Sequence, residues 1–225
     1  MSDIASRIAH LRARIAEAAE QGGRRTDDVR LIAVTKGVDP HAVGEALATG
    51  ITDFGESRIQ EAETKVAAFP HLRWHMVGHL QRNKVRQAVR IFSVIQSVDS
   101  ERLAVELSAR ADGQRAIDIL LQVNVAGESQ KFGVALREVP AILREVAGMP
   151  GLRVIGLMTI APQVADPETV RPVFRSLREL RDSVRASGIV GDEFIHLSMG
   201  MTDDFEVAIE EGATMVRIGR AVFGL

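Results

Sequence analysis

The segment Leu31-Ile32-Ala33-Val34-Thr35-Lys36-Gly37 fixes the architecture that we predict for this chain. Five mostly aliphatic and β-branched residues lead directly into a lysine. The length of the run, its β-branched content and the glycine after it favour a strand buried on both faces over a buried helix. Asp39 is typical of a helix N-cap and Pro40 of a first helical residue. Lys36 is therefore predicted where a central strand ends and a loop leading into a helix begins.

A lysine at the end of a buried strand is costly unless it has a chemical role. Burial disfavours the charged form of the side chain and makes the amine a better nucleophile, which a Schiff-base lysine needs. The alternative is an exposed lysine whose ammonium group reaches solvent. This segment alone does not decide between the two interpretations of Lys36.

Composition excludes several classes of protein. The 225 residues contain no cysteine and no tyrosine, so neither a disulfide framework nor thiolate chemistry is available. No apolar run approaches the roughly 18 residues of a membrane span, and the first residues lack a signal-peptide pattern. The formal charge of −2 comes without a block of like charge, which argues against nucleic acid as a partner. We expect a cytoplasmic protein that forms one domain over residues 1–225.

Strand-like and helix-like segments alternate along the chain after an amphipathic N-terminal helix. That helix carries Ile4, Ile8, Leu11 and Ile15 on one face and ends near Gln21. The predicted strands cover residues 31–35, 51–54, 73–77, 91–98, 117–123, 153–158, 193–197 and 214–218. The predicted helices between and after them cover residues 40–48, 57–68, 82–89, 101–111, 136–147, 167–186 and 204–210.

Eight strands in β-α alternation predict an α/β fold: a single (β/α)8 TIM barrel with the extra N-terminal helix. An open doubly wound sheet is the alternative, but no Gly-x-Gly-x-x-Gly motif follows the first strand. In a barrel, functional groups lie at the C-terminal ends of the strands and in the loops that follow. Lys36 occupies such a position.

The loops after the seventh and eighth predicted strands are typical of a phosphate site. Gly200 and Gly219 would let backbone N–H groups approach an anion, and Ser198 and Thr202 add hydroxyl donors. Ordinary loops with a helix cap are the alternative interpretation. Because the last strand of a closed barrel pairs with the first, this phosphate site would lie beside Lys36. An aldehyde that carries a phosphate would fit between them, and pyridoxal 5'-phosphate is such a molecule.

Other polar residues follow the second, third and fifth strands. Five of them are candidates for the barrel mouth: Glu56, Arg58, His79, Gln81 and Asn83. We interpret His75 as a core histidine and expect no metal site, because His75 and His79 would not share one face. Lys131 could approach the mouth, although a lysine in such a loop is more often simply exposed.

Taken together, six segments resemble the pyridoxal phosphate homeostasis protein family, also called YggS/PROSC-type proteins, in order and over nearly the whole chain. They are Ala33-Val34-Thr35-Lys36, Phe54-Gly55-Glu56-Ser57-Arg58-Ile59-Gln60-Glu61, Trp74-His75-Met76-Val77-Gly78-His79-Leu80-Gln81-Arg82-Asn83-Lys84, Gly156-Leu157-Met158-Thr159, Leu197-Ser198-Met199-Gly200-Met201-Thr202-Asp203-Asp204-Phe205 and Arg217-Ile218-Gly219-Arg220-Ala221-Val222-Phe223-Gly224.

The resemblance implies a barrel like the N-terminal domain of alanine racemase that holds pyridoxal 5'-phosphate as an aldimine on Lys36. It also implies that Arg217 faces the pyridine nitrogen. The phosphate-binding segment matches Ser198, Met199, Gly200, Thr202 and Gly219. The resemblance also implies that Ser57 is a cofactor-binding residue, at a position where the family usually has the longer side chain of Asn. The implied role is to bind, store and deliver the cofactor to apo-enzymes, with no catalytic residue.

Two enzymatic alternatives remain open at this point. A racemase-like enzyme would use Lys36 as one base, and His79 or a bound water would replace the tyrosine base of related racemases. A class I aldolase-type barrel would attack a phosphosugar with Lys36, although such lysines generally lie on a later strand. The absence of tyrosine and cysteine argues against the first alternative. Because the domain through which racemases dimerise is missing, we expect a monomer.

Overall fold

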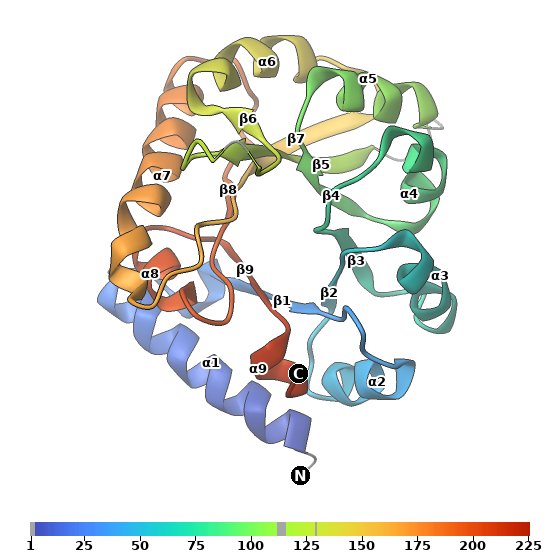
Figure 1. The fold of residues 1–225 in the computed structure, drawn as a ribbon, viewed down its shortest axis with the longest axis vertical. Coiled ribbons are helices and arrows are strands. Elements are labelled where there is room, and N and C mark those ends of the chain that lie inside the picture. Colours follow the sequence, from blue (N-terminus) through green and yellow to red (C-terminus); the bar gives the residue numbers. More distant parts are fainter. Residues whose placement is uncertain (1–2, 112–115, 129) are drawn as a thin grey trace.

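The computed structural model describes residues 3–111, 116–128 and 130–225, and its parallel strands close into a barrel surrounded by helices (Figure 1). Within these residues, β4 pairs with β5 and β1 pairs with β9, so that eight strands form a continuous ring. The predicted TIM barrel is therefore confirmed. The ring consists of β1 (Arg30–Val34), β2 (Asp53–Glu56), β3 (Arg73–Met76), β4 (Val94–Val98), β5 (Ile117–Asn124), β7 (Leu152–Met158), β8 (His196–Ser198) and β9 (Met215–Ile218).

The helices form an outer layer around the ring, each following the strand that precedes it in the chain (Figure 1). Asp39 caps the first of them as predicted, because its side chain accepts a hydrogen bond from the Ala42 N–H at 2.9 Å. The layer consists of α2 (Pro40–Ala48), α3 (Ile59–Ala68), α4 (Val85–Ile91), α5 (Glu101–Arg110), α6 (Val139–Val146), α7 (Arg171–Ala186) and α8 (Phe205–Glu210), with short 3₁₀ turns at Thr26–Asp28, Arg82–Lys84, Leu136–Glu138 and Pro167–Val170.

Two separate apolar clusters fill the molecule, because alternate side chains of a barrel strand point inward and outward. The larger cluster lies between the strands and the helices and includes Phe54, Trp74 and Ile95. The smaller one fills part of the barrel interior with Ile32, Val94, Leu120, Ile155, Met158 and Met215. Polar residues occupy the remaining interior positions, and they matter for the site below.

The N-terminal helix α1 (Asp3–Gln21) packs against α8 and the C-terminal end of the barrel chain, as Figure 1 shows. Ile8, Leu11 and Ile15 of its predicted apolar face are buried. Arg14 also stabilises the contact between α1 and α8. Its guanidinium lies 4.7 Å from the centre of the Phe205 ring and donates a 2.7 Å hydrogen bond to Glu206. The apolar face of the extra helix therefore packs against the barrel domain itself.

Several predicted boundaries differ from the structure. The apolar run from residue 91 begins as the end of α4, because Ile91 and Phe92 close that helix against the core before β4 starts at Val94. Residues 193–195 precede β8 instead of forming it. Two short elements were not predicted at all, the two-residue β6 (Val134–Ala135) and α9 (Arg220–Phe223). Of the helices in the described residues, none is long and apolar enough to cross a membrane.

Candidate functional site

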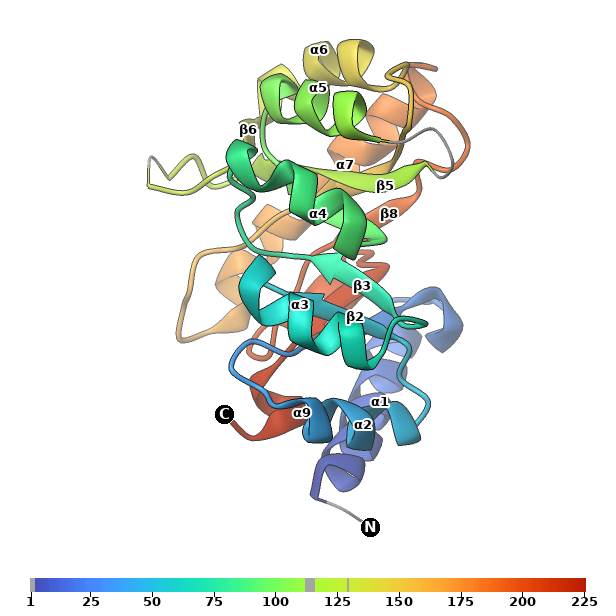
Figure 2. The ribbon, with the colours of Figure 1, turned by 90° about the vertical axis from the view of Figure 1, so that its right-hand side faces the viewer.

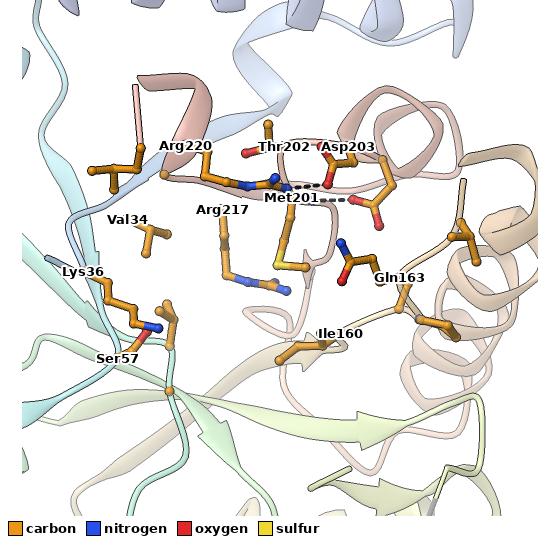
Figure 3. Close-up of a pocket in the computed structure, with 18 of the residues that line it drawn as sticks. Val34, Lys36, Ser57, Ile160, Gln163, Met201, Thr202, Asp203, Arg217 and Arg220 are labelled. Atoms are coloured by element: carbon orange, nitrogen blue, oxygen red, sulfur yellow. Dashed lines mark hydrogen bonds and ion pairs between the residues drawn. The ribbon is translucent and has the colours of Figure 1, made fainter. Parts of the chain in front are cut away.

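A cavity of about 850 Å³ opens at the C-terminal ends of the strands, where the barrel rule places functional sites. Figure 2 shows the loop after β7 projecting on the same side of the barrel as the C-terminus. Figure 3 shows the cavity from close by. Its walls come from the C-terminal ends of seven strands and the loops that follow them. They include Val34, Lys36, Ser57, Val77, Gly78, Lys131, Ile160, Ala161, Gln163, Val164, Met201, Thr202, Asp203, Asp204, Arg217, Gly219, Arg220 and Leu225.

Lys36 lines this cavity two residues beyond the end of β1, and it is exposed instead of buried. Of the two interpretations that the sequence left open for Lys36, the structure therefore shows the exposed lysine, beyond a strand that ends at Val34. Glu61 of α3 holds that turn by accepting a 2.9 Å hydrogen bond from the Gly37 N–H. Within the described part of the chain, the Lys36 amino group has no ion-pair partner, so it is available to a ligand.

Beneath Lys36 lies a buried ion pair that fixes the two loops on either side of it. The Glu56 carboxylate accepts hydrogen bonds from the Ser57 N–H at 3.0 Å and the Thr35 hydroxyl at 2.8 Å. Lys65 of α3 donates to the same carboxylate and to the Thr35 carbonyl. Glu56 is completely buried and Lys65 is 4% exposed. The expectation that Glu56 lines the mouth is therefore wrong, because this pair turns its side chain into the wall.

Arg217 forms the floor of the cavity, and Figure 3 shows it between Lys36 on one side and Met201 on the other. Its guanidinium donates to the Ser198 hydroxyl at 2.7 Å and to the Thr159 carbonyl at 2.8 Å. Burial lowers the pKa of Arg217 to about 10, so the side chain is still a cation at neutral pH. Ile32 of β1 lies opposite Arg217 in the barrel register, which brings the arginine close to the Lys36 loop.

Only some residues of the predicted phosphate-binding segment line the cavity, and the others are buried behind its wall. Thr202 and Gly219 line the cavity. Ser198 and Met199 are completely buried and lie outside the lining set. The Ser198 hydroxyl donates to Gln96 at 2.7 Å and the Met199 N–H to the Met215 carbonyl at 3.1 Å, so both donors are already engaged. Gly200 turns the chain with φ +91°, and a Cβ there would lie 2.7 Å from the Cβ of Ala208.

Two neighbouring carboxylates and an arginine complete the phosphate side of the cavity. Asp203 pairs with Arg220, as the dashed line in Figure 3 shows. Asp204 precedes α8, but its side chain accepts the Met201 N–H at 2.6 Å instead of capping that helix. Burial raises the pKa of Asp204, although the hydrogen bond with Met201 and the charge of Arg217 oppose that shift. Asp204, and not Thr202 or Asp203, therefore occupies the N-cap position of α8 (Phe205–Glu210).

The remaining candidates lie away from the main cavity or at its edge. His79 lines a separate hollow of about 180 Å³, pairs with Asp99 at 3.1 Å and stacks on Phe132. Lys131 reaches the main cavity and pairs with Glu128. His75 is completely buried, as predicted. Arg58, Gln81 and Asn83 are not among the main lining residues: Arg58 and Gln81 line the hollow beside His79, and Asn83 is exposed. Among the described residues, no cluster of His, Cys, Asp or Glu could hold a metal ion.

Sequence reasoning missed three parts of the site. The wall at residues 160–167 follows β7 and has no recognisable motif. Gln96 approaches Ser198 across 102 residues of sequence, which no local pattern reveals. Lys65 was detectable in principle, because Ile59, Ala62 and Lys65 share the buried face of α3, where a lysine is out of place.

Comparison with known proteins identifies a family model and several relatives of this chain. The family model described as alanine racemase, N-terminal domain matches residues 7–225. The pyridoxal phosphate homeostasis protein of Aquifex aeolicus is 42% identical over 97% of this chain and 96% of its own length. The protein of the same name from Pseudomonas aeruginosa is 43% identical over 100% of this chain and 96% of its own.

Solved structures lead to the same family. PipY of Synechococcus elongatus, solved with pyridoxal phosphate bound, has a TM-score of 0.85 at 33% identity and covers 99% of this chain and 100% of that one. Alanine racemase of Corynebacterium glutamicum has a TM-score of 0.74 at 18% identity, covers 98% of this chain and 62% of that one, and shares the fold. The predicted resemblance is confirmed: this chain belongs to the pyridoxal phosphate homeostasis protein family, within the group that carries the alanine racemase N-terminal domain.

Proposed function

We propose that this protein binds pyridoxal 5'-phosphate in the main cavity and serves in the intracellular storage and delivery of that cofactor. One observation carries the proposal. A single cavity presents an available amine at Lys36, a buried cation at Arg217 and donors at Thr202 and Arg220. These are the groups that an aldehyde, a pyridine nitrogen and a phosphate require. The relatives named as pyridoxal phosphate homeostasis proteins, and PipY with its bound pyridoxal phosphate, support it.

Lys36 is the residue that we assign to the aldehyde. When bound, the cofactor supplies an electrophilic carbon and a conjugated ring. The chain supplies a nucleophilic nitrogen on a turn held by the Glu61 contact. Ser57 lies beside Lys36 in Figure 3 and lines the same wall. Its N–H donates a hydrogen bond to the buried Glu56 carboxylate, which holds the wall beside the lysine in place.

Arg217 is the residue that we assign to the pyridine nitrogen. A guanidinium that remains charged donates hydrogen bonds and does not deliver a proton at neutral pH. The ring nitrogen would accept from it and remain unprotonated. Such a ring is a weak electron sink, which disfavours carbanion chemistry and is consistent with carriage of the cofactor.

Thr202, Gly219 and Arg220 are the residues that we assign to the phosphate. Of the described lining residues, four carry positive charge and two carry negative charge, so the cavity complements a dianion. Since the donors of Ser198 and Met199 are engaged elsewhere, we propose that these two shape the wall, and that Gly200 gives the turn its left-handed backbone.

We propose that the protein carries the cofactor without catalytic turnover. The chain has no tyrosine or cysteine to serve as a second acid–base group. Within the described lining no histidine is present, Asp203 is paired with Arg220, and Asp204 is held by the Met201 N–H. Lys36 is therefore left without an obvious proton partner of the kind that a racemase needs.

We also propose that residues 1–225 form a single cofactor-binding domain that is monomeric and cytoplasmic. The apolar face of α1 is buried against α8, so it does not offer a surface to a second copy. Light scattering at micromolar protein concentration would test this, and a stable dimer would refute the monomer.

The visible absorbance of the purified protein with added pyridoxal 5'-phosphate tests the main proposal. We expect a band that Lys36→Ala abolishes, and a borohydride-fixed adduct that maps to Lys36. Lys131→Ala is the matched control, because Lys131 lines the same cavity but pairs with Glu128, and it should keep the band. Absence of the band in the unaltered protein would overturn the proposal. Enzyme-like exchange of amino-acid α-protons in heavy water would overturn carriage without turnover.

A further inference from the structure

A continuous chain of buried hydrogen bonds runs through the barrel interior from the cavity floor toward the opposite end of the strands. Arg217 donates to the Ser198 hydroxyl at 2.7 Å, and that hydroxyl donates to Gln96 Oε1 at 2.7 Å. Gln96 Nε2 lies 2.9 Å from His75 Nδ1, and His75 Nε2 lies 2.9 Å from Asp53 Oδ1. Asp53 begins β2, at the end of the barrel farthest from the cavity.

Every link in this chain points the same way. Burial lowers the pKa of His75, so the ring is neutral at physiological pH. Asp53 accepts only, because its carboxylate is ionised: burial raises its pKa, but the contacts with His75 and the charge of Arg30 outweigh that effect. His75 therefore donates from Nε2 and accepts at Nδ1 from the Gln96 amide. Each donor from Arg217 down to His75 is thus directed toward Asp53.

The common orientation of these hydrogen bonds offsets part of the free-energy cost of burying two opposite charges, on Arg217 and Asp53. The lone-pair ends of the three neutral side chains face the Arg217 cation and their hydrogens face the Asp53 anion, so each polarises the next. Ser198, Gln96 and His75 are all completely buried. Water cannot substitute for a missing link, and a break leaves buried donors and acceptors without partners.

We propose that Gln96 is a positioning residue for Arg217: its amide fixes the Ser198 hydroxyl so that an oxygen lone pair, and not the hydrogen, faces the guanidinium. Gln96 is the link that sets the direction, because its amide accepts from Ser198 through Oε1 and donates to His75 through Nε2. The consequence for cofactor binding rests on the proposed function, whereas the effect on Arg217 itself does not.

Two variants and a control test this in cofactor-free protein, by NMR of the Arg217 side-chain N–H groups. Gln96→Met keeps the size of the side chain but breaks both links, and we expect hydrogen exchange at Arg217 to become about three- to tenfold faster. Gln96→Glu, with one proton shared between the new carboxyl and His75, keeps every link and should restore slow exchange. Ser97→Ala is the control: Ser97 is equally buried on the same strand, and its hydroxyl has no partner among the described residues.

A third variant tests whether the effect travels along the chain. Asp53→Asn removes the terminal charge but retains an acceptor for His75, and we expect a shift in the Arg217 resonances without loss of folding. This variant decides the question if Gln96→Met does not fold. Unchanged Arg217 exchange in folded Gln96→Met, or unchanged Arg217 resonances in Asp53→Asn, would overturn the proposal.

A parallel titration with pyridoxal 5'-phosphate separates this proposal from the proposed function. If the cofactor binds, Gln96→Met should weaken its binding about three- to tenfold and Ser97→Ala should not change it. Equal affinity of Gln96→Met and the unaltered protein would refute the link to the ligand. Failure of the unaltered protein to bind would refute the proposed function and leave the NMR result standing.

Discussion

Lys65→Met tests how strongly the buried ion pair beneath the site holds the fold together. Lys65 is 4% exposed and its only carboxylate partner among the described residues is Glu56, which is completely buried. Methionine has similar length and no charge. The change therefore leaves the Glu56 carboxylate in the interior without a counter-ion, and leaves the Thr35 carbonyl without the ammonium group that now donates to it.

The expected cost follows from this geometry. Removal of one partner of a buried pair destabilises a protein by about 3–5 kcal/mol, because an uncompensated charge remains. Glu56 keeps two other hydrogen bonds, from Thr35 and Ser57, so we expect a loss of about 3 kcal/mol, at the lower end of this range. In a protein of this size, that loss corresponds to a fall in Tm of about 6–12 °C.

Urea unfolding of cofactor-free protein measures this cost. Glu56→Gln combined with Lys65→Met removes both charges, and we expect the double variant to be more stable than Lys65→Met alone by about 1–2 kcal/mol. Lys84→Met is the control, because Lys84 has no ion pair among the described contacts, and it should change stability by less than about 0.5 kcal/mol. A cost below about 1 kcal/mol for Lys65→Met, or a double variant that is less stable than the single one, would refute the reasoning.

Three further predictions concern other parts of the fold. Asp39→Ala removes the side-chain cap of α2 and should lower the free energy of unfolding by about 1 kcal/mol in urea titrations. Gly78→Ala would place a Cβ 2.3 Å from the Ser57 carbonyl oxygen, so thermal melts should show a large loss of stability, whereas Gly148→Ala, with open space around it, should be nearly neutral. Burial raises the pKa of Glu211, but hydrogen bonds and charges from arginines of α7 outweigh it, so its net pKa is lowered. Glu211→Gln should therefore cost about 1–3 kcal/mol at pH 7. The difference should shrink as the pH falls below the ordinary glutamate pKa of 4.5, and it should vanish only when the native carboxyl, whose pKa is lower, is protonated as well.

The fold was predictable because its signals are local and repeated. Eight β-branched or apolar runs alternate with helical patterns, and a turn or cap residue such as Asp39 separates many of them. The boundary between α4 and β4 was predicted wrongly because one apolar run, which includes Ile91 and Phe92, belongs to both elements. The elements β6 and α9 were not predicted because they are too short to show a hydrophobic period. Strand order then followed from the handedness of the crossovers.

The site was only partly predictable from the sequence. The residues that line the cavity can be recognised by their position at strand ends, whereas the residues that support them cannot. Lys36, Thr202 and Gly219 stand at strand ends, where the barrel rule directs attention. Ser198 stands at such an end as well, yet its hydroxyl points to Gln96. Which way a side chain turns at the end of a strand depends on the opposite wall of the barrel, and that wall is distant in sequence.

The polar chain inside the barrel is not explained by stability. Part of the interior is apolar, with Ile32, Val94 and Met215 among its members, so the barrel can close around apolar side chains. Replacement of buried charges by well-packed apolar side chains is often neutral or stabilising. The chain of hydrogen bonds that ends at Arg217 therefore acts to position this residue on the cavity floor, and not to stabilise the barrel. It holds a guanidinium, charged and correctly turned, in a place where burial alone would favour its neutral form.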